Sequence, residues 1–441
     1  MKSPNSSSAE HCDGVSILGA GIAGIMAART LVQAGFKNTV IYEARRRFGG
    51  CIDTDYKLAK GRPVERGPEF FHGRTGILHS LAQELDLTLI EAPSEGLHYS
   101  DKKLTAQNGL LSSTIDRLRS LARTLLQSGF PDMPVRDFLV RDDARTIIEE
   151  TRVFTTHTIE QLFRNDFGAE PKKLGIAGIV ETDVTGYDAN FRVKEGYSEL
   201  VRRAAEGLDI RLNTPIQSVD WTKRDTILLK SEKQNYAARK VIFALPHGVL
   251  KHGDVQVYPP FPDAKQEAIE AIGVGNACKI ILLFKRAFWP KNMGFLSTEL
   301  DTQLWWPALA EHNDDDQSAL LTTFIGGRTV RRFEQPKKRS QVREMAADEL
   351  RQMFPKGTVD EQILSESASS FWGSGRRFSR GAFSYLPAGC DPNAREKLRE
   401  PIDDRIFFAG EATSTDGGVA SVHGAARSGV RAAEEVMKNF R

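Results

Sequence analysis

Three glycines near the N-terminus have the spacing of a phosphate-binding turn. Gly19, Gly21 and Gly24 follow a short apolar run, Val15–Leu18, which predicts a buried strand, and they open a predicted helix over residues 22–34. Gly19 would permit the tight turn, Gly21 would let a pyrophosphate approach the backbone, and Gly24 would let the helix pack closely on the sheet. The N–H groups and the positive dipole end of the helix would face the phosphates. The pattern therefore predicts a dinucleotide-binding unit.

A carboxylate and a basic loop follow this unit. Glu43 ends the next predicted strand, 24 residues after Gly19, about where a ribose-binding acid belongs. The arginines 45–47 and the glycine pair 49–50 come next and suit a loop that lines phosphates. A solvated basic turn is the alternative for this charged run.

Two residues with acid–base chemistry, Glu69 and His72, flank the aromatic residues Phe70 and Phe71. A carboxylate among apolar side chains needs a partner or acquires a raised pKa. Glu69 is therefore a candidate for binding a substrate ammonium group or for removing its proton. A structural role in the core is the alternative for both residues.

A single lysine, Lys279, stands at the entrance of the apolar run 280–284, after a glycine-rich turn. This pattern predicts a buried strand that begins near the lysine. By pattern alone, a lysine at the start of a strand is expected to face solvent.

Composition limits the class of protein. The chain has 441 residues, a formal charge of +2 and four cysteines without a C-x-x-C pair. The length suffices for two domains, and the near-neutral charge favours neither nucleic acid nor an anionic membrane as a partner. No metal site is predicted. The polar N-terminus lacks the apolar core of a signal peptide, and no run of 18 apolar residues occurs, so we expect no membrane segment and a cytoplasmic protein.

Two motifs far apart in the chain resemble one family. The motif E-A-x-x-R-x-G-G at residues 43–50 resembles the second signature of the FAD-dependent amine oxidases, which include monoamine and polyamine oxidases, histone demethylases and L-amino-acid oxidases. The C-terminal stretch 405–433, a predicted strand with Gly410 and Glu411 followed by a helix from Val422, is similar to the last block of that family. Further similar blocks, at residues 64–73, 272–290 and 379–385, extend the likeness over nearly the whole chain.

The resemblance implies an α/β protein with a discontinuous Rossmann-like FAD-binding domain and an inserted α+β substrate-binding domain. The implied FAD-binding domain comprises residues 1–75, 194–262 and 396–441. The implied substrate-binding domain comprises residues 76–193 and 263–395. Within the latter, apolar spacing predicts a mostly helical stretch from residue 78 to about residue 161.

The resemblance also implies roles for single residues. It assigns catalysis to Glu69 and to Lys279, which would hold a water at the flavin N5 atom, and it makes Phe383 one wall of an aromatic cage. The implied cofactor-binding residues are Gly19, Gly21, Ala23, Gly24, Glu43, Ala44, Arg45, Gly49, Gly50, Gly67, Pro68, Ile216, Gly410, Glu411 and Val422. The implied substrate-binding residues are His72, Tyr187, Arg331, Phe383 and Ser421.

Three positions depart from the family pattern. Cys51 replaces an arginine that usually helps to bind FAD. Ala382 stands where monoamine oxidases carry the cysteine that binds flavin covalently, so we expect noncovalent FAD. Ser421 replaces the second aromatic residue of the cage, which favours a bulkier or more polar substrate than a small arylalkylamine.

The implied reaction moves a hydride from the carbon alpha to a substrate nitrogen onto flavin N5, and oxygen then reoxidises the flavin to give hydrogen peroxide. The implied partners are a small-molecule amine or amide and O2, and a homodimer is left open. Three alternatives remain open. They are a biosynthetic tailoring oxidase that acts on a C–N bond of a larger metabolite, an L-amino-acid oxidase that uses one of Arg331, Arg376, Arg377 and Arg380 as a carboxylate clamp, and a flavin-binding module without turnover.

Overall fold

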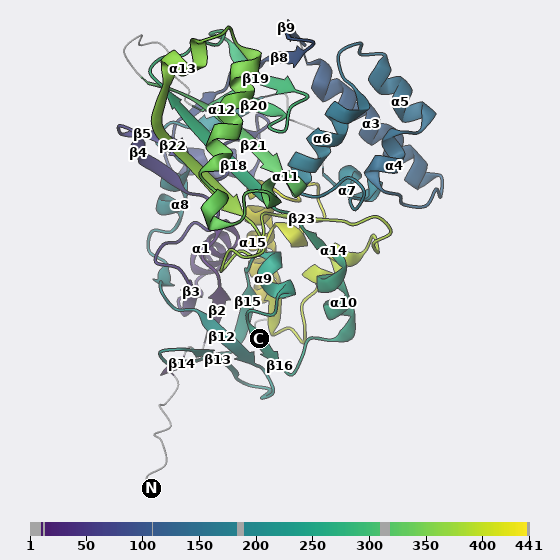
Figure 1. The fold of residues 1–441 in the computed structure, drawn as a ribbon. Helices are drawn as coiled ribbons and strands as arrows, with labels where there is room; N and C mark the ends of the chain where they lie inside the picture. The colour runs from purple at the N-terminus through teal and green to yellow at the C-terminus, as the bar shows by residue number, and fades with distance from the viewer. Residues whose placement is uncertain (1–9, 12–13, 108, 183–188, 309–317, 439–441) are drawn as a thin grey trace.

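The computed structural model describes residues 10–11, 14–107, 109–182, 189–308 and 318–438 (Figure 1). A parallel sheet lies in the lower part of Figure 1, a larger and mainly antiparallel sheet lies above it, and a group of helices lies to one side. The predicted α/β fold is therefore present, with strands from distant parts of the chain in one sheet.

The parallel sheet has five strands, and all neighbouring strands in it run parallel. In spatial order the strands are β11 (Asp209–Arg211), β3 (Thr39–Tyr42), β2 (Val15–Leu18), β15 (Lys240–Phe243) and β24 (Ile406–Phe408). Every residue of the four strands other than β11 is buried, because both faces of the sheet are covered. This burial explains why these strands read as continuous apolar runs rather than as alternating patterns.

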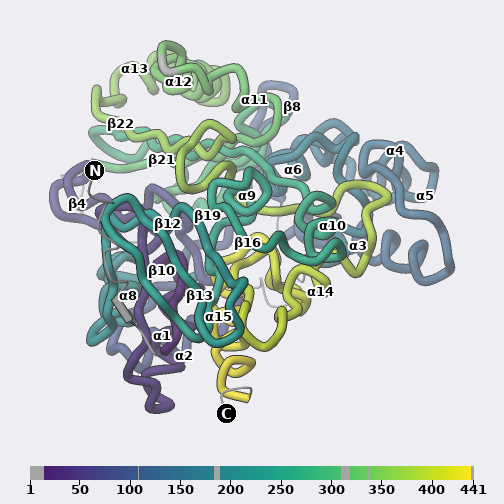
Figure 2. Tube along the Cα trace, turned by 90° about the horizontal axis from the view of Figure 1, so that it is seen from below, coloured from purple at the N-terminus to yellow at the C-terminus, as the bar shows by residue number. Residues whose placement is uncertain are grey.

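Two helices from opposite ends of the chain cover one face of this sheet. They are α1 (Ile22–Gln33) and α15 (Val422–Lys438), which lie side by side in both views (Figure 2). Their contact is close because Gly429 of α15 has no side chain, and a Cβ atom there would lie 2.1 Å from the carbonyl oxygen of Ala23. The helices α2 (Ile77–Glu84) and α8 (Tyr197–Ala204) belong to the same apolar cluster.

A second five-stranded sheet covers the other face. Its core residues, including Val219 and Leu229, share one apolar cluster with Phe243 and Phe408 of the parallel sheet. In spatial order its strands are β1 (Glu10–His11), β14 (Asn235–Ala238), β13 (Ile227–Ser231), β12 (Ile216–Asp220) and β16 (Gln256–Tyr258). The helices α10 (Asp263–Ala271) and α14 (Ala394–Arg399) pack on this side as well. All of α10 and the first two residues of α14 fall within the predicted substrate domain. The exact domain boundaries stay a prediction.

The upper sheet has seven strands, antiparallel except for the pair β8–β19. In spatial order they are β22 (Ile363–Trp372), β18 (Ala277–Phe284), β21 (Ala319–Gly326), β20 (Leu304–Pro307), β19 (Met293–Thr298), β8 (Glu95–Ser100) and β9 (Lys103–Ala106). Helix α12 (Gln341–Met353) packs on one face, and the hairpin of β4 (Thr54–Ala59) and β5 (Arg62–Glu65) packs on the other.

The helices beside this sheet form a separate apolar cluster. They are α3 (Leu110–Gln127), α4 (Val135–Leu139), α5 (Asp142–Glu149), α6 (Thr156–Phe167) and α7 (Ile176–Val180). The remaining elements are β6 (Phe71–His72), β7 (Leu89–Glu91), β10 (Asn190–Val193), β17 (Gly273–Val274), β23 (Ser384–Tyr385), α9 (His247–Lys251), α11 (Gly327–Arg331), α13 (Thr358–Gln362) and the 3₁₀ turns η1 (Pro336–Lys338) and η2 (Glu411–Thr413).

The prediction of a mostly helical stretch between residues 78 and 161 was wrong for residues 89–106. These residues form β7, β8 and β9, and β8 pairs with β19 nearly 200 residues later in the chain. Local periodicity carries no information about a partner at that distance, so tertiary pairing decided the conformation. Across the described ranges, we find no helix with the length and apolar character that a membrane crossing requires.

The packing of α15 on α1 yields a prediction. Replacing Gly429 by alanine should lower the free energy of unfolding by about 1–3 kcal/mol, because the new methyl group would overlap the backbone of α1. Thermal unfolding of the purified protein measures this change. Gly375→Ala is the matched control, since Gly375 is exposed and no heavy atom lies within 4 Å of the place that its new methyl group would take. Equal stability of the two variants would contradict the prediction.

Candidate active site

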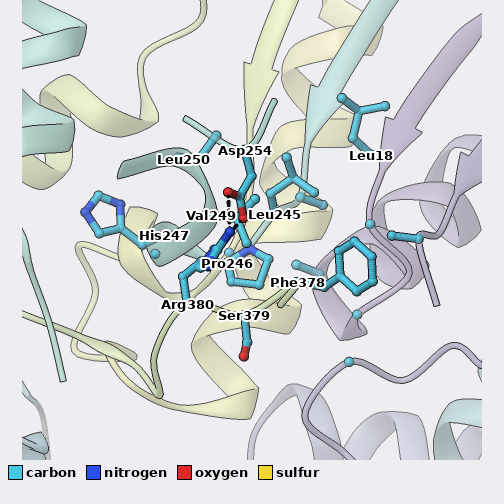
Figure 3. Close-up of a pocket in the computed structure, with 18 of the residues that line it drawn as sticks. Leu18, Leu245, Pro246, His247, Val249, Leu250, Asp254, Phe378, Ser379 and Arg380 are labelled. Carbon is cyan, nitrogen blue, oxygen red and sulfur yellow. Dashed lines mark hydrogen bonds and ion pairs between the residues drawn. The ribbon is translucent and has the colours of Figure 1, made fainter. Parts of the chain in front are cut away.

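A cavity of about 460 Å³ lies at the carboxyl ends of the parallel strands. It is the place where an open parallel sheet usually binds a ligand. The predicted cofactor residues among its lining are Gly19, Gly21, Ala23, Glu43, Ala44, Arg45, Gly49, Gly50, Ile216, Gly410 and Glu411. Two further segments complete the lining. They are residues 244–250 with 254–255, and residues 377–383, several of which are drawn in Figure 3.

The glycines form a backbone cradle. Gly19 has a φ angle of +101°, which favours glycine, and a Cβ atom on Gly50 would lie 3.1 Å from the Cα atom of Gly21. A Cβ atom on Gly24 would lie 2.0 Å from the carbonyl oxygen of Gly19, so this glycine is needed for packing rather than for ligand contact. No side chain caps the first turn of α1, which leaves its N–H groups for a phosphate.

The acid after β3 lies where the sequence predicts it. Glu43 is buried at the cavity, and its carboxylate accepts hydrogen bonds from the N–H of Ala20 and the N–H of Arg45, both at 2.9 Å. These bonds fix the carboxylate between the glycine turn and the basic loop. Ile216, at the start of β12, lines the same cavity.

The C-terminal block supplies a second carboxylate, which is half-buried. Glu411 accepts hydrogen bonds from the N–H and Oγ of Ser384, at 3.0 and 2.8 Å, and from the N–H of Ala420 at 3.0 Å. Both partners lie in segments that approach the cavity from other directions. The carboxylate therefore joins the end of β24 to the loop before α15 and to β23.

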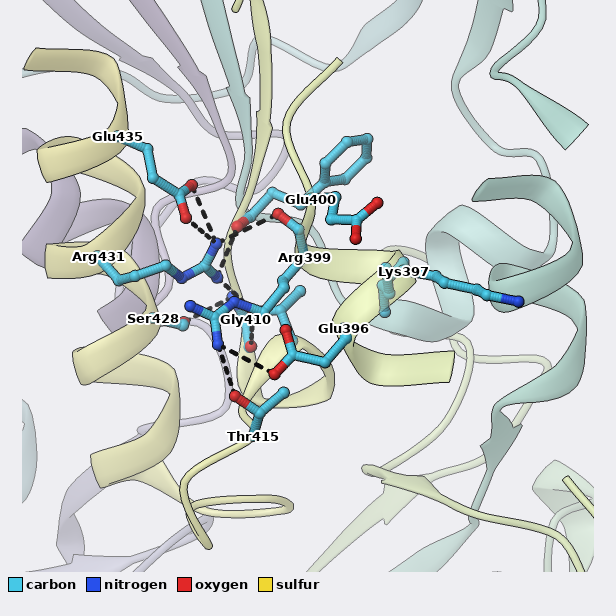
Figure 4. Close-up of polar contacts among 12 residues, drawn as sticks. Glu396, Lys397, Arg399, Glu400, Gly410, Thr415, Ser428, Arg431 and Glu435 are labelled. Carbon is cyan, nitrogen blue, oxygen red and sulfur yellow. Dashed lines mark hydrogen bonds and ion pairs between the residues drawn. The ribbon is translucent and has the colours of Figure 1, made fainter. Parts of the chain in front are cut away.

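Helix α15 holds the loop that carries Gly410 (Figure 4). The N–H of Gly410 donates to Ser428 Oγ at 2.8 Å. The guanidinium group of Arg431 donates to the carbonyl oxygen of Phe408 at 2.9 Å and to Thr413 Oγ1 at 2.8 Å, and it pairs with Glu435. Arg431 thus contacts the chain both before and after Gly410. The sequence analysis missed this arginine, because helical spacing alone does not show which loop a residue will reach.

The two predicted catalytic residues form one buried ion pair. The Nζ atom of Lys279 lies 2.7 Å from Glu69 Oε2 and donates to the carbonyl oxygen of Gly67 at 3.0 Å. Each side chain is 3% exposed. The expectation from pattern alone that Lys279 would face solvent was wrong, because β18 is an interior strand of the upper sheet.

Two residues that the sequence analysis missed complete this cluster. Arg192 Nε donates to Glu69 Oε1 at 2.8 Å, and Trp306 Nε1 donates to Glu69 Oε2 at 2.9 Å. Burial alone would raise the pKa of Glu69, but the charges of Lys279 and Arg192 outweigh it and lower that pKa below its ordinary value. The cluster therefore holds one carboxylate between two cations. The available signal for Arg192 was a charge between the two apolar residues Phe191 and Val193.

His72 lies beside this cluster as a neutral imidazole. Its Nδ1 atom lies 2.7 Å from Asn190 Oδ1, and burial lowers the pKa of His72 to about 4. Its ring lies 6.3 Å from that of Phe70, which in turn contacts Arg192 and Trp306. At neutral pH, His72 adds no positive charge to the site.

The remaining predicted residues are more scattered. Phe383 lines the cavity and stacks on Phe324, with ring centres 6.3 Å apart. Ser421 accepts a hydrogen bond from the N–H of Gly424 at 3.0 Å and so caps α15, a role that the sequence analysis did not consider. Arg331 is exposed at the end of α11 and does not line this cavity. Tyr187 lies outside the described residues.

Four predicted cofactor residues, Gly24, Gly67, Pro68 and Val422, lie outside the cavity lining. Gly67 packs against the loop that follows the glycine pair 49–50, since a Cβ atom there would lie 1.9 Å from the carbonyl oxygen of Cys51. Val422 is the first residue of α15. These residues shape the surroundings of the cavity.

The residues present fit a flavin dinucleotide. The glycine cradle and the uncapped end of α1 suit a pyrophosphate, and Glu43 suits a ribose hydroxyl. In the part of the chain that the structure describes, no cluster of three or more histidine, cysteine or acidic residues could hold a metal ion.

Comparison with known proteins agrees with this geometry. The family model of the flavin-containing amine oxidoreductases matches residues 22–437. The chain therefore belongs to this family and is an FAD-dependent oxidoreductase that acts on CH–NH groups. The family resemblance and the fold class predicted from the sequence are confirmed.

Among its relatives, polyamine oxidase 2 of Arabidopsis thaliana is 28% identical over 96% of this chain and 87% of that protein. Lysine-specific histone demethylase 1B of Mus musculus is 27% identical, over 97% of this chain but only 53% of that protein. Two solved structures share the fold with a TM-score of 0.77 at 20% identity, covering 97% of this chain and 99% of theirs. They are cyclohexylamine oxidase from Brevibacterium oxydans and putrescine oxidase bound to putrescine.

The buried cluster yields a prediction for stability. Glu69→Gln should lower the free energy of unfolding by about 3–5 kcal/mol, because it leaves Lys279 and Arg192 buried without their anion. Lys279→Met should lower it less, since Glu69 keeps Arg192 and Trp306 as partners. Urea denaturation followed by tryptophan fluorescence compares the variants. A Glu69→Gln variant as stable as the wild type would contradict the assigned ion pair.

Proposed function

We propose that this protein oxidises the carbon alpha to the nitrogen of a small-molecule amine, with O2 as the electron acceptor and hydrogen peroxide as a product. The observation that carries the proposal is the ion pair of Glu69 and Lys279. It joins the interior strand β18 to the segment at Gly67, which packs against the loop after the glycine pair 49–50. When bound, FAD supplies the hydride acceptor and the reaction with oxygen. Lys279 places a fixed positive charge at this junction, and such a charge favours the reduction of oxygen.

The charges of the cluster bear on the protonation state of the substrate. Glu69 already accepts hydrogen bonds from three side chains, and the charges of Lys279, Arg192 and Glu69 sum to one excess positive charge. Burial raises the pKa of the nearby Glu65 to about 7, so this second carboxyl offsets that charge only in part at neutral pH. A protonated amine nearby would be repelled, so the neutral amine is the reacting form. Under this proposal Glu69 orients Lys279 and Arg192 and does not remove a proton.

The cofactor is proposed to be held without a covalent bond. Position 382, which lines the cavity, is an alanine, and the cavity-lining Cys51 follows Gly50 at the phosphate end. Acid precipitation of the yellow protein should therefore release all of the FAD into the supernatant, where its absorbance is measured. Flavin that stays with the precipitated protein would contradict noncovalent binding.

Aliphatic diamines, polyamines and cycloalkylamines are the substrates we propose first, because the names of the relatives above point to these classes. A second candidate is a larger nitrogenous metabolite whose C–N bond is oxidised, because position 421 is a serine rather than an aromatic residue. The Ser421 hydroxyl itself is used within the protein, since it donates to the carbonyl oxygen of Gly418 and accepts from the N–H of Gly424. For an L-amino-acid oxidase, two of the four arginines named as carboxylate clamps are unsuited, because Arg331 is exposed and Arg380 already pairs with Asp254. Arg377 lines the cavity.

A peroxide-coupled screen tests the proposal. Purified holoenzyme should release hydrogen peroxide with at least one amine in a panel of diamines, polyamines, cycloalkylamines, amino acids and larger nitrogenous metabolites. With that amine, the rate of anaerobic flavin reduction should rise with pH until the amine is neutral. A protein that binds FAD but is reduced by no amine in the panel would favour the module without turnover.

Lys279→Met provides the control for the oxygen reaction. Stopped-flow spectroscopy separates flavin reduction by the amine from reoxidation by O2. The variant should slow reoxidation more than reduction, because it removes the charge while the Glu69–Arg192 pair remains. An equal loss in both steps would contradict the role of Lys279.

A further inference from the structure

The outer wall of the cofactor cavity is an irregular segment, residues 373–383, which we term the wall loop. It connects β22 to β23 and contains no helix or strand. Its residues 377–383 line the cavity, including Phe383 at the inner end. The opposite side is formed by residues 244–250 and 254–255. Because both segments line the same cavity, a cofactor there would contact both of them.

The backbone of the wall loop adopts conformations that it would not hold without support. Phe378 and Arg380 have φ angles of +68° and +56°. Residues other than glycine rarely adopt this region of backbone conformation. Gly381 follows with a φ angle of +150°. Such conformations persist only where surrounding contacts hold them.

Few hydrogen bonds join the outer part of the loop to other segments of the chain. Arg45 Nη2 donates to the carbonyl oxygen of Phe378 at the long distance of 3.3 Å, and the N–H of Ala382 donates to the carbonyl oxygen of Gly275 at 2.8 Å. The strongest contact lies between these two. Arg380 binds Asp254 through two parallel hydrogen bonds, Nε to Oδ2 at 2.7 Å and Nη2 to Oδ1 at 2.8 Å (Figure 3).

This pair is the only ion pair between the wall loop and the opposite side among the described residues. Both of its side chains line the cavity, and they are 23% and 22% exposed. The Arg380 hydrogen bonds lower the pKa of Asp254, so its carboxylate stays ionised at neutral pH. Two-point binding between a guanidinium and a carboxylate fixes orientation as well as distance.

The segment that carries Asp254 is packed tightly against the same loop. A Cβ atom on Gly248 of α9 would lie 2.7 Å from the carbonyl oxygen of Arg380 and 2.8 Å from that of Ser379. The two sides therefore meet in backbone contact next to the ion pair. Separation of the two sides must break the ion pair and this contact together.

We propose that Asp254 and Arg380 are positioning residues whose ion pair closes the wall loop over the cofactor cavity and so slows the dissociation of FAD. Neither residue belongs to the glycine cradle or to the carboxylates that suit the cofactor. They act through the position of the wall loop, which also carries Phe383. Because the pair is partly exposed, salt weakens it.

The rate of FAD dissociation from the holoenzyme tests this proposal. The release is followed by the recovery of flavin fluorescence after dilution into an excess of a flavin-scavenging apoprotein. Asp254→Asn and Arg380→Gln should each raise the rate about 5- to 10-fold, which corresponds to the loss of one charge-assisted hydrogen-bonded pair. The double variant should be no faster than the faster single variant, because the two residues act as one unit.

The controls separate the ion pair from general damage to the fold. Asp360→Asn removes a partner of Arg351 on the surface of α12 and α13, and it should leave the rate unchanged. Raising the potassium chloride concentration from 0.05 to about 0.5 M should speed the release from the wild type but not from the double variant. Additive effects of the two single variants, or a wild-type rate that does not change with salt, would overturn the proposal.

Discussion

The parallel sheet can be completed only when three distant parts of the chain meet. β2 and β3 come from the N-terminal part, β11 and β15 from the middle, and β24 from the C-terminal part. Parallel neighbours cannot be joined by a tight turn, so the chain must leave the sheet and return between strands. The long excursions form the seven-stranded sheet and the helices α3–α7. The cofactor cavity is therefore composite, since each of its walls comes from a segment that returns to the same edge of the sheet.

Buried charge connects the segment before β6 to the upper sheet and to β10. Glu69 accepts hydrogen bonds from Lys279 on β18, from Arg192 on β10 and from Trp306 on β20. Each of these strands belongs to a different part of the chain, and a single carboxylate satisfies all three donors. An arrangement of this kind tolerates little change, because the loss of the anion would leave two cations buried together. Under the proposed function, the same charges would favour a neutral amine over a protonated one.

The sequence was sufficient for much of the cofactor site. The glycine spacing, Glu43 after its strand, and Gly410 with Glu411 are local patterns, and the structure places all of these residues except Gly24 at one cavity. Such patterns can be recognised in a sequence because the backbone geometry of a phosphate turn requires glycine at particular positions. Roles that depend on contacts between distant segments could not be predicted from the sequence. Arg192, Trp306, Arg431 and Asp254 became visible only through their partners, and Ser421 was interpreted as part of a cage although its hydroxyl caps a helix.

The sequence by itself determined the class of cofactor and the glycine and acidic residues that suit it, because these follow from short-range patterns of glycine, apolar and acidic residues. The tertiary structure decided the charges of the site and the way it is closed. Glu69 and Lys279 lie 210 residues apart in the chain yet 2.7 Å apart in space, and Asp254 and Arg380 meet across 126 residues. The energy of a buried charge depends on every group within a few ångströms, whichever part of the chain supplies it. Only the folded chain specifies that set of neighbours.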